Sequence, residues 1–278
     1  MAGTLYVVGT PIGNLNDMTQ RAVQTLRKVD FIAAEDTRVT QKLLNHFDIK
    51  KHTMSYHQHS REAVSEQIVA RILAGESCAV VTDAGMPCIS DPGEDLVCLC
   101  AERGVAVVVV PGPSAVVSAL AVSGLSTARF SFEGFLSTNR KNRLEHLESI
   151  KGDRHTLIFY EAPHKLVNTL RDLLEALGDR RVSLARELTK LHEEVIRTTL
   201  SGALELYEQQ PPRGEYVLVV EGAPEPARTE LSFDDAVELV RTRMRGGEPI
   251  TSAAKELAKE TGYKKGDLYK AALSQENN

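Results

Sequence analysis

The chain has 278 residues, of which 42% are hydrophobic, and a formal net charge of −5 at pH 7. This length suits about two domains with sizeable cores, and the negative total means that local basic patches would have to hold any nucleic-acid partner. No apolar run reaches the roughly 18 residues of a membrane-spanning helix. The N-terminal "MAGTLYVV" lacks the basic and apolar regions of a signal peptide, so the sequence predicts a cytoplasmic protein.

The first part of the chain alternates short apolar segments with amphipathic ones. Strands are predicted within residues 4–8, 30–35, 77–85 and 105–110, and helices within 19–29, 37–47, 61–74, 93–104 and 114–124. This alternation is typical of a mainly parallel sheet with helices on both faces. We therefore expect an N-terminal α/β domain over residues 1–125.

A second α/β domain is predicted over residues 126–224. Its strand-like segments lie within 129–135, 156–163, 181–188, 193–199 and 214–222, and its main helices within 138–150 and 164–178. Some of these strands follow one another without a long helix, so a mixed sheet is expected.

The composition changes at "GAPEPARTE", residues 222–230, which reads as a linker. Beyond it, Ser232 begins an S-x-x-D cap, and apolar residues then recur at helical spacing. Two shorter helices follow, separated by a turn at Gly262, as in a helix-turn-helix unit. Residues 225–278 are thus predicted to form a small helical module.

Three loops that follow predicted strands are rich in glycine and proline: "GTPIGN", "TDAGMPCISDPG" and "PGPSA". In an open α/β sheet, ligands bind beyond the carboxyl ends of the strands, so these loops offer bare backbone to a ligand. They contain no Lys or Arg, and the chain has neither a phosphate-binding G-x-x-x-x-G-K-[ST] motif nor the G-x-G-x-x-G dinucleotide motif. A ligand without phosphate groups is therefore favoured, although each loop taken singly could be an ordinary turn.

Eight motifs in this order, namely "GTPIGNLND", "AEDTR", "DAGMPCISDPG", "PGPSA", "EGFL", "FYEAPH", "RELTKLHEE" and "GEYVLVVEG", resemble the tetrapyrrole-methylase superfamily. The resemblance covers essentially the whole chain and is greatest with the branch that acts on small-subunit ribosomal RNA. It implies two α/β domains with S-adenosylmethionine in the cleft between them, a homodimer, and 2′-O-methylation of a cytidine ribose in 16S rRNA.

The same resemblance implies a set of cofactor-binding residues. They are Pro11, Ile12 and Gly13 in the first loop, Gly85, Met86, Pro87 and Ile89 in the second, Ser114 and Ala115 at a helix start, and Phe159, Tyr160, Leu188, Tyr216 and Val217 in the second domain. Relatives that act on tetrapyrroles often carry Asp at the position of Met86, so a carboxylate contact is not expected there. The free N–H groups at a helix start suit a carboxylate or a polar edge of adenosine.

Methyl transfer to a ribose hydroxyl benefits from a general base or a group that stabilises charge. The candidate catalytic residues are Asp36, Arg38 and Glu161, with Glu35, Lys190 and Glu193 as further polar groups. Arg38 could hold a phosphate beside the reacting ribose. An equally weighted alternative is that Asp36 or Thr37 caps a helix and Arg38 pairs with an acid. If the loop is catalytic, replacing Asp36 or Arg38 with Ala abolishes methyl transfer while cofactor binding persists.

No metal site is predicted. His57 and His59 lack a third ligand, and the spacing of Cys78, Cys88, Cys98 and Cys100 fits no zinc motif. Basic clusters that could bind rRNA comprise Arg140, Lys141, Arg143, Arg180, Arg181, Arg186 and Lys190, and in the helical module Lys255, Lys259, Lys264, Lys265 and Lys270, with Tyr263 and Tyr269 available for stacking. The alternative is a solvated face with Tyr269 in the core.

Two rival functions remain at this point. A methyltransferase for a tetrapyrrole carbon would share the fold, but a small ring needs no basic helical appendage. A DNA-binding regulator that senses a small ligand would need Arg, Asn or Gln early in its recognition helix, whereas "KKGDLYKAAL" offers lysines and a tyrosine.

Overall fold

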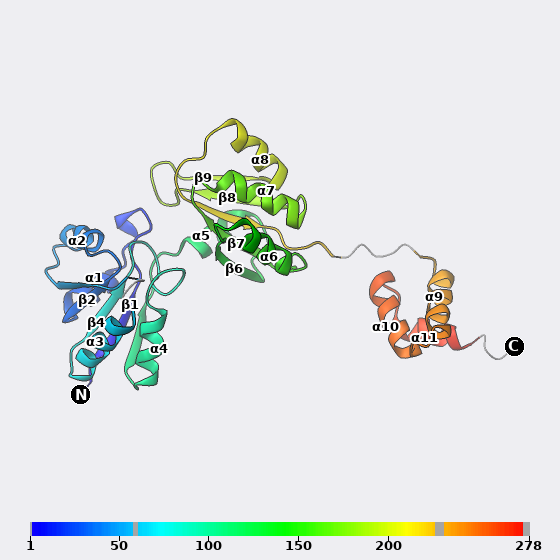
Figure 1. Ribbon diagram of the computed structural model, residues 1–278, viewed down its shortest axis with the longest axis horizontal. Coiled ribbons are helices and arrows are strands. Elements are labelled where there is room, and N and C mark those ends of the chain that lie inside the picture. Colours follow the sequence, from blue (N-terminus) through cyan, green and yellow to red (C-terminus); the bar gives the residue numbers. More distant parts are fainter. Residues whose placement is uncertain (1, 58–60, 226–230, 275–278) are drawn as a thin grey trace. The chain divides into compact units, whose positions relative to one another are not determined.

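The computed structural model describes residues 2–57, 61–225 and 231–274 of the chain. They form two compact units, Met1–Ala223 and Pro224–Asn278, the second of which is drawn in orange and red in Figure 1. In this described part of the chain, no helix has the length and apolar character needed to cross a membrane.

The first sheet of the larger unit is entirely parallel, with strand order β3-β2-β4-β1-β5. Its strands are β1 (Thr4–Val8), β2 (Phe31–Ala34), β3 (His52–Ser55), β4 (Cys78–Val81) and β5 (Ala106–Val110). Strands β2 and β4 are buried at every residue, as expected of central strands covered on both faces. Strand β3 is short and partly exposed, and no apolar run marks it in the sequence.

Helices cover both faces of this sheet and enclose two separate hydrophobic cores. They are α1 (Gln20–Lys28), α2 (Thr37–His46), α3 (Arg61–Leu73) and α4 (Glu94–Glu102), and a short 3-10 turn, η1 (Leu15–Asp17), precedes α1. The first core contains residues of α3 and α4, and the second contains residues of α1 and α2. The predicted alternation of strands and helices is confirmed here.

The second sheet is mixed, as predicted, with strand order β6-β7-β10-β8-β9. It comprises β6 (Phe130–Phe135), β7 (Thr156–Glu161), β8 (Arg181–Arg186), β9 (Glu194–Thr199) and β10 (Tyr216–Val220), and its helices are α6 (Arg140–Ile150), α7 (Leu166–Leu177) and α8 (Leu200–Gln209). Only β6 and β7 pair in parallel, while the other neighbours are antiparallel. Because β7 and β10 are antiparallel, the last residue of β7, Glu161, lies opposite the first residue of β10, Tyr216.

Helix α5 (Ala115–Ser123) follows β5 in the chain but packs on the second sheet. Its buried residues Val116, Ala119 and Leu120 lie in one cluster with residues of β7, β8 and β10. The chain therefore leaves the first sheet at the "PGPSA" loop, before the boundary predicted at residue 125. As a result, the start of α5 lies beside both sheets.

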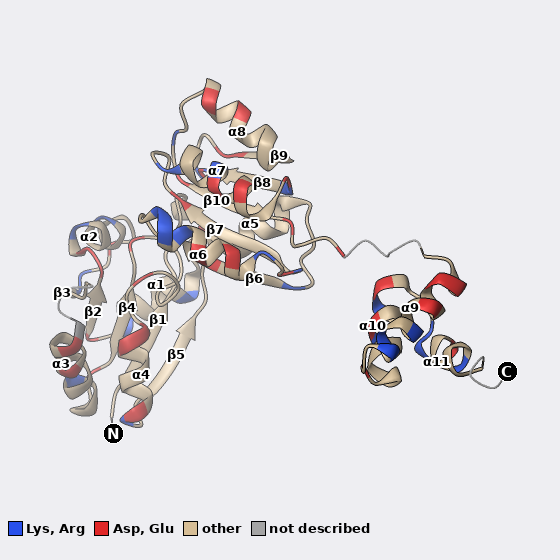
Figure 2. Ribbon diagram, turned by 45° about the vertical axis from the view of Figure 1, so that its right-hand side comes forward, with Lys and Arg blue, Asp and Glu red and all other residues tan. Residues whose placement is uncertain are grey.

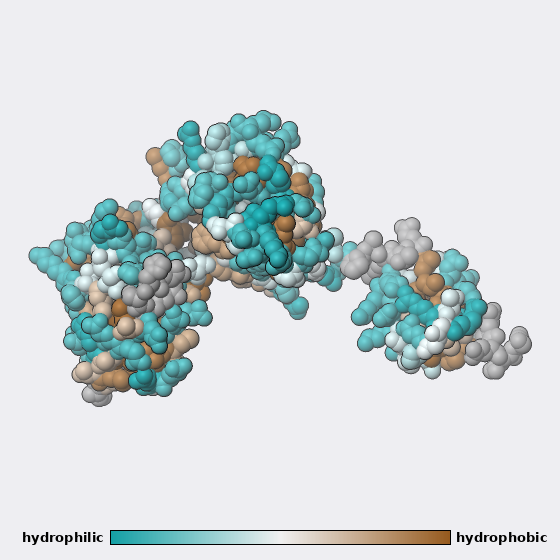
Figure 3. All heavy atoms as spheres, in the orientation of Figure 1, coloured by the Kyte–Doolittle hydropathy of each residue, from teal (hydrophilic) through white to brown (hydrophobic). Residues whose placement is uncertain are grey.

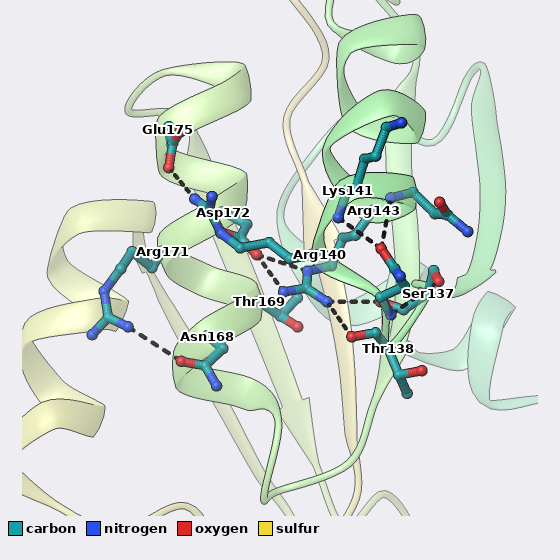
Figure 4. A network of polar contacts seen from close by, with 12 residues as sticks. Ser137, Thr138, Arg140, Lys141, Arg143, Asn168, Thr169, Arg171, Asp172 and Glu175 are labelled. Atoms are coloured by element: carbon teal, nitrogen blue, oxygen red, sulfur yellow. Dashed lines mark hydrogen bonds and ion pairs between the residues drawn. The ribbon is translucent and has the colours of Figure 1, made fainter.

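A buried carboxylate joins α6 to α7, as Figure 4 shows. Asp172 of α7 accepts hydrogen bonds from Arg140 Nε at 3.1 Å and from Arg143 Nε at 2.7 Å. Its side chain is only 4% exposed, so removing either arginine would leave part of a buried charge without its partner. Arg180 is also buried, and it donates to the carbonyl oxygens of Leu177, Glu221 and Lys151.

These contacts give internal partners to the second-domain arginines that were named as possible rRNA contacts, and an RNA role for them stays a prediction. Arg140, Arg143 and Arg180 hold the domain together, and Arg181 and Arg186 pair with Glu221 and Glu194. The sequence shows a basic cluster, but only the tertiary structure shows that acidic and carbonyl partners lie against it.

The smaller unit consists of α9 (Phe233–Arg245), α10 (Ile250–Thr261) and α11 (Lys265–Leu273) around one apolar cluster. Ser232 caps α9 as predicted, because its Oγ accepts the Asp235 N–H at 3.1 Å. Tyr263 packs edge-on against Phe233, and its hydroxyl donates to the Leu231 carbonyl. This half-buried side chain therefore packs against the core of the unit, with its hydroxyl already bonded.

Candidate functional site

The carboxyl ends of β1, β4 and β5 meet, and the three loops that follow them are joined through their backbones. Thr10 and Gly85 exchange two main-chain hydrogen bonds, at 2.9 and 3.2 Å. Gly9 and Gly112 approach so closely that a Cβ on Gly9 would lie 2.7 Å from Gly112 N. Only glycine fits at such a contact between two backbones, which explains why glycine recurs in these loops.

A cavity of about 320 Å³ opens beside the carboxyl ends of these strands. Its volume is at the lower end of the range for small-molecule sites. The loops of the first sheet form one wall, and the second sheet and the loops at its edge form the other. The lining residues are Ile12, Ala84, Gly85, Met86, Ile89, Ser90, Asp91, Ser114, Ala115, Phe135, Tyr160, Glu161, Ala162, Ala185, Glu187, Leu188, Lys190, Glu215, Tyr216 and Val217.

Most of the residues predicted from the sequence to bind the cofactor line this cavity. They are Ile12, Gly85, Met86, Ile89, Ser114, Ala115, Tyr160, Leu188, Tyr216 and Val217, together with the predicted catalytic residue Glu161. The structure thus brings together residues from segments that are up to about 200 positions apart in the sequence.

Four of the predicted cofactor residues are not in the lining. Pro11 and Pro87 are buried in their loops, and Gly13 lies under Lys190, whose Cγ would be 2.5 Å from a Cβ at that position. Phe159 is fully buried in the main core of the second domain. Successive residues of a strand face opposite sides of a sheet, so Phe159 faces the core and Tyr160 faces the cavity.

Lys190, named from the sequence among the further polar groups, also lines the cavity, and eight lining residues were not named from the sequence: Ala84, Ser90, Asp91, Phe135, Ala162, Ala185, Glu187 and Glu215. Some of them follow a readable signal, since Ser90 and Asp91 stand in the same "TDAGMPCISDPG" loop as the predicted residues. Others, such as Phe135 and Glu215, become neighbours of the cavity only through strand pairing.

Two loops of the lining hold residues in the left-handed backbone region. Cys88 and Ser90 have φ of 72° and 63°, and Glu187 and Thr189 have φ of 50° and 67°. Among the described residues other than glycine, only Asp48 shares this feature. Such conformations cost on the order of 1–3 kcal/mol each and tend to occur at ligand sites.

The charged residues on the second-sheet side form an internal cluster. Lys190 Nζ donates to Glu187 Oε1 and to Glu215 Oε2, both at 2.9 Å. The main-chain N–H of Glu215 and the Lys190 ammonium lower the pKa of Glu187. Across the described lining residues, Lys190 is the sole cation, and these two carboxylates neutralise it.

Glu161 and Tyr160 lie at the end of β7 and differ in their contacts. Glu161 is buried, accepts the Thr169 hydroxyl at 2.5 Å and also accepts the Ala162 N–H at 2.8 Å. Burial, together with the charge of Asp91, raises the pKa of Tyr160 to about 12. Tyr160 and Asp91 therefore face the same space from the two walls.

Asp36 and Arg38 do not line the cavity. Asp36 caps α2, because its Oδ1 accepts the Arg38 N–H at 2.8 Å, and the Arg38 guanidinium pairs with the same carboxylate at 2.6 Å. The Arg38 side chain is 87% exposed, and its bonds lower the pKa of Asp36 to about 2. This geometry is that of a capped helix start, and a catalytic role for either residue stays a prediction.

The residues considered as metal ligands form no site in the described part of the chain, where no three His, Cys, Asp or Glu side chains are arranged around a possible ion. His59 lies outside the described residues. Burial raises the pKa of Cys78 to about 12 and that of Cys100 to about 11, and no disulfide joins the four cysteines.

Comparison with known proteins gives a consistent result. The family model for tetrapyrrole (corrin/porphyrin) methylases matches residues 4–204. The chain is 46% identical to ribosomal RNA small subunit methyltransferase I of Synechocystis, over 99% of both chains. It is also 46% identical to the protein of that name from Halalkalibacterium halodurans, over 96% of this chain and 93% of the other.

Solved structures share the fold at low sequence identity. Diphthine synthase matches with a TM-score of 0.60 at 13% identity, over 96% of this chain and 99% of that one. Uroporphyrin-III C-methyltransferase of Thermus thermophilus, solved with S-adenosyl homocysteine, matches with a TM-score of 0.56 at 19% identity, over 78% and 97%. The chain therefore belongs to the tetrapyrrole methylase family and, within it, to the ribosomal RNA small subunit methyltransferase I group.

Proposed function

We propose that the protein transfers a methyl group from S-adenosylmethionine to the ribose 2′-hydroxyl of a cytidine in 16S ribosomal RNA, acting in the cytoplasm. The observation that carries this proposal is the near-full-length identity to relatives named ribosomal RNA small subunit methyltransferase I. The target nucleotide and the ribose oxygen come from the family resemblance described above.

The chemistry of the cavity fits the proposed methyl donor. S-adenosylmethionine carries a cationic sulfonium and no phosphate, so its site needs backbone groups and apolar walls, without a cluster of cations. Gly85, Ala84 and Ala115 offer backbone with little side chain, while Tyr160 and Tyr216 offer aromatic surface. A nucleoside triphosphate would need cations that the described lining lacks, since Lys190 is held by two glutamates.

Several lining residues would hold the donor. We assign the backbone around Gly85 and the start of α5 at Ser114 and Ala115 to its polar ends, and Leu188 and Val217 to its adenine. When bound, it supplies an electrophilic methyl carbon. The residues of the chain align the ribose oxygen with this carbon, exclude water and take up the hydroxyl proton.

The smaller unit is the proposed RNA-docking module. Charges of both signs alternate along α9 to α11 in Figure 2, and hydrophilic residues cover most of the face of this unit seen in Figure 3. The proposed phosphate contacts, for which no acidic partner is found among the described residues, are Lys255, Lys259, Lys264, Lys265 and Lys270. Binding through such lysines weakens as salt rises. Arg38, which is exposed in the first turn of α2, is a further proposed phosphate contact.

We also propose a homodimer. Strand β5 is the edge of the first sheet, and its Val107 and Val109 side chains are exposed. Exposed valines on an edge strand favour burial against another chain.

The test is methyl transfer from labelled S-adenosylmethionine to small ribosomal subunits from cells that lack the modification, followed by mapping of 2′-O-methyl groups. We expect one labelled cytidine ribose in 16S rRNA. A parallel reaction with a precorrin tests the rival function. Label in the precorrin and none in the subunit would refute the proposal.

A further inference from the structure

Four carboxylic acids line the cavity, and three of them have partners that hold them in place. Glu161 is bonded to the Thr169 hydroxyl and to a main-chain N–H. Glu187 and Glu215 share the Lys190 ammonium. The fourth, Asp91, has no basic partner among the described residues and no main-chain donor.

Asp91 lies in the loop between β4 and α4, where the backbone is constrained. Its neighbour Ser90 has a positive φ of 63°. Ser90 also lies against β6, because its Oγ would be 3.4 Å from a Cβ on Gly134. The loop of the first wall thus contacts the second sheet through Ser90, and it presents Asp91 to the cavity opposite Tyr160.

Asp91 belongs to a polar group in which two carboxylates, its own and that of Glu35, compete for the Thr82 hydroxyl, with the Asp83 carboxylate nearby. Thr82 donates its hydroxyl to Glu35 Oε2 at 2.5 Å and lies within hydrogen-bonding reach of Asp91. Asp83 adds a third negative charge, and its own N–H bonds Glu35 at 3.2 Å. A threonine hydroxyl has a single proton, so it cannot satisfy both Glu35 and Asp91 while both are ionised.

The negative charges of Glu35 and Asp83 near Asp91 favour its protonated form. Burial is the largest cause of its raised pKa, the charges of Glu35 and Asp83 add to it, and the Thr82 hydroxyl opposes them, giving a value of about 6. A general base works best when its pKa lies near the working pH. Other charged groups near this loop are the Asp36–Arg38 pair, which acts on Asp83, and Glu94, whose charge acts with that of Asp91 on the neighbouring Cys88 thiol.

We propose that the Asp91 carboxylate accepts the proton of the ribose 2′-hydroxyl during methyl transfer, an inference that rests on the proposed function. The ribose oxygen forms a bond to the methyl carbon as the carbon–sulfur bond of the donor breaks and its electron pair remains on sulfur. The hydroxyl proton passes to an Asp91 carboxylate oxygen. Thr82 is a positioning residue, because its hydroxyl is the hydrogen-bonding partner of Asp91, and the nearby negative charge of Glu35 favours uptake of the proton.

The same carboxylate could serve instead as a counter-ion for the sulfonium. The two roles differ in ways that can be measured, because a counter-ion binds the cationic donor more tightly than the neutral product S-adenosylhomocysteine. A proton acceptor has no such preference, and it acts only in the reaction.

The test uses the full chain, undermethylated small subunits and the variant Asp91→Asn, which keeps the shape of the side chain. We expect kcat to fall about 10²- to 10⁴-fold, the usual contribution of a general base, while KM for the subunit changes less than threefold. The wild-type rate should fall tenfold per pH unit below about pH 6, and Asp91→Asn should lose this dependence. Glu94→Gln, an exposed change in the first turn of α4, is the matched control.

Calorimetry supplies a readout that does not depend on activity. Asp91→Asn should bind S-adenosylmethionine and S-adenosylhomocysteine with unchanged affinities. A loss of affinity for the methylated donor alone would identify a counter-ion and overturn the proposal, as would a kcat within threefold of the wild type. If the wild-type protein itself transfers no label to subunits, the proposed function fails, which separates that outcome from failure of Asp91 alone.

Discussion

The two walls of the cavity are built in opposite ways. The first-sheet wall consists of loops whose backbones touch, as at Gly9 and Gly112, and it carries Asp91, which has no cationic partner in the described part of the chain. The second-sheet side is built from strand residues such as Tyr160 and from adjoining loop residues, and its Lys190 is bonded to Glu187 and Glu215. The backbone thus shapes the first wall, which also carries the reactive Asp91 side chain, whereas side chains that are bonded to one another form the second wall.

The largest expected effect comes from filling the backbone contact of the first wall. A methyl group at Gly9 would lie 2.7 Å from both Gly112 N and Met86 Sδ, so Gly9→Ala must separate the loops. We expect a loss of about 1–3 kcal/mol in the free energy of unfolding and at least tenfold weaker binding of S-adenosylmethionine, measured by denaturation and calorimetry. Gly152→Ala, where a Cβ meets no atom within 4 Å, is the control. Unchanged donor affinity in Gly9→Ala would show that the contact does not shape the site.

A smaller effect is expected from the aromatic surface of the second wall. The Tyr160 ring packs against Phe132 and Phe135, with ring centroids 5.0 and 5.4 Å away. Tyr160→Leu should weaken donor binding about tenfold, which corresponds to about 1.4 kcal/mol, with only modest loss of stability. Phe130→Leu, at the other end of β6, should leave calorimetric affinity unchanged. Equal donor affinities in the wild type and Tyr160→Leu would show that the ring does not contribute to donor binding.

The smallest effect concerns the charged cluster of Lys190, Glu187 and Glu215. Lys190→Met leaves Glu187 without its ammonium partner, and we expect a loss of about 1 kcal/mol in stability at neutral pH. Because the pKa of Glu187 is depressed below its ordinary value of 4.5, its stabilising effect is present above that pH and disappears as the acid form accumulates. The difference between variant and wild type should therefore shrink below about pH 4 in urea unfolding curves. The exposed pair Lys141–Glu145 supplies the control, Lys141→Met, and a constant difference at all pH values would contradict this account.

The same contrast explains what could be predicted from the sequence. The loops of the first wall are local features, so glycine and proline at the ends of strands are enough to mark the segments that hold Ile12, Gly85 and Ser114. The alternation of side chains along a strand, in contrast, does not tell which face of the sheet lines the cavity and which faces the core. The family resemblance named both Phe159 and Tyr160, and only the sheet shows that Phe159 faces the core.

Charged residues were the hardest to interpret, because the role of a charge depends on partners that are remote in sequence. Arg140 and Arg143 look like an RNA patch until Asp172 is found about 30 positions away in the chain but in contact in space. Asp91 looks like an ordinary turn residue until Glu35 and Asp83 are found beside it.

By itself the sequence determined the alternation of strands and helices, the glycine-rich loops, the capped start of α9 and the family. These properties depend on the order of residues along the chain, which periodicity and local backbone preference govern. Only the tertiary structure decided that α5 covers the second sheet, that Arg143 of α6 is bound to a buried carboxylate, and that Asp91 faces the cavity beside two other carboxylates. Those properties depend on which distant residues come into contact and exclude water, and the strength of an electrostatic interaction is set by that burial.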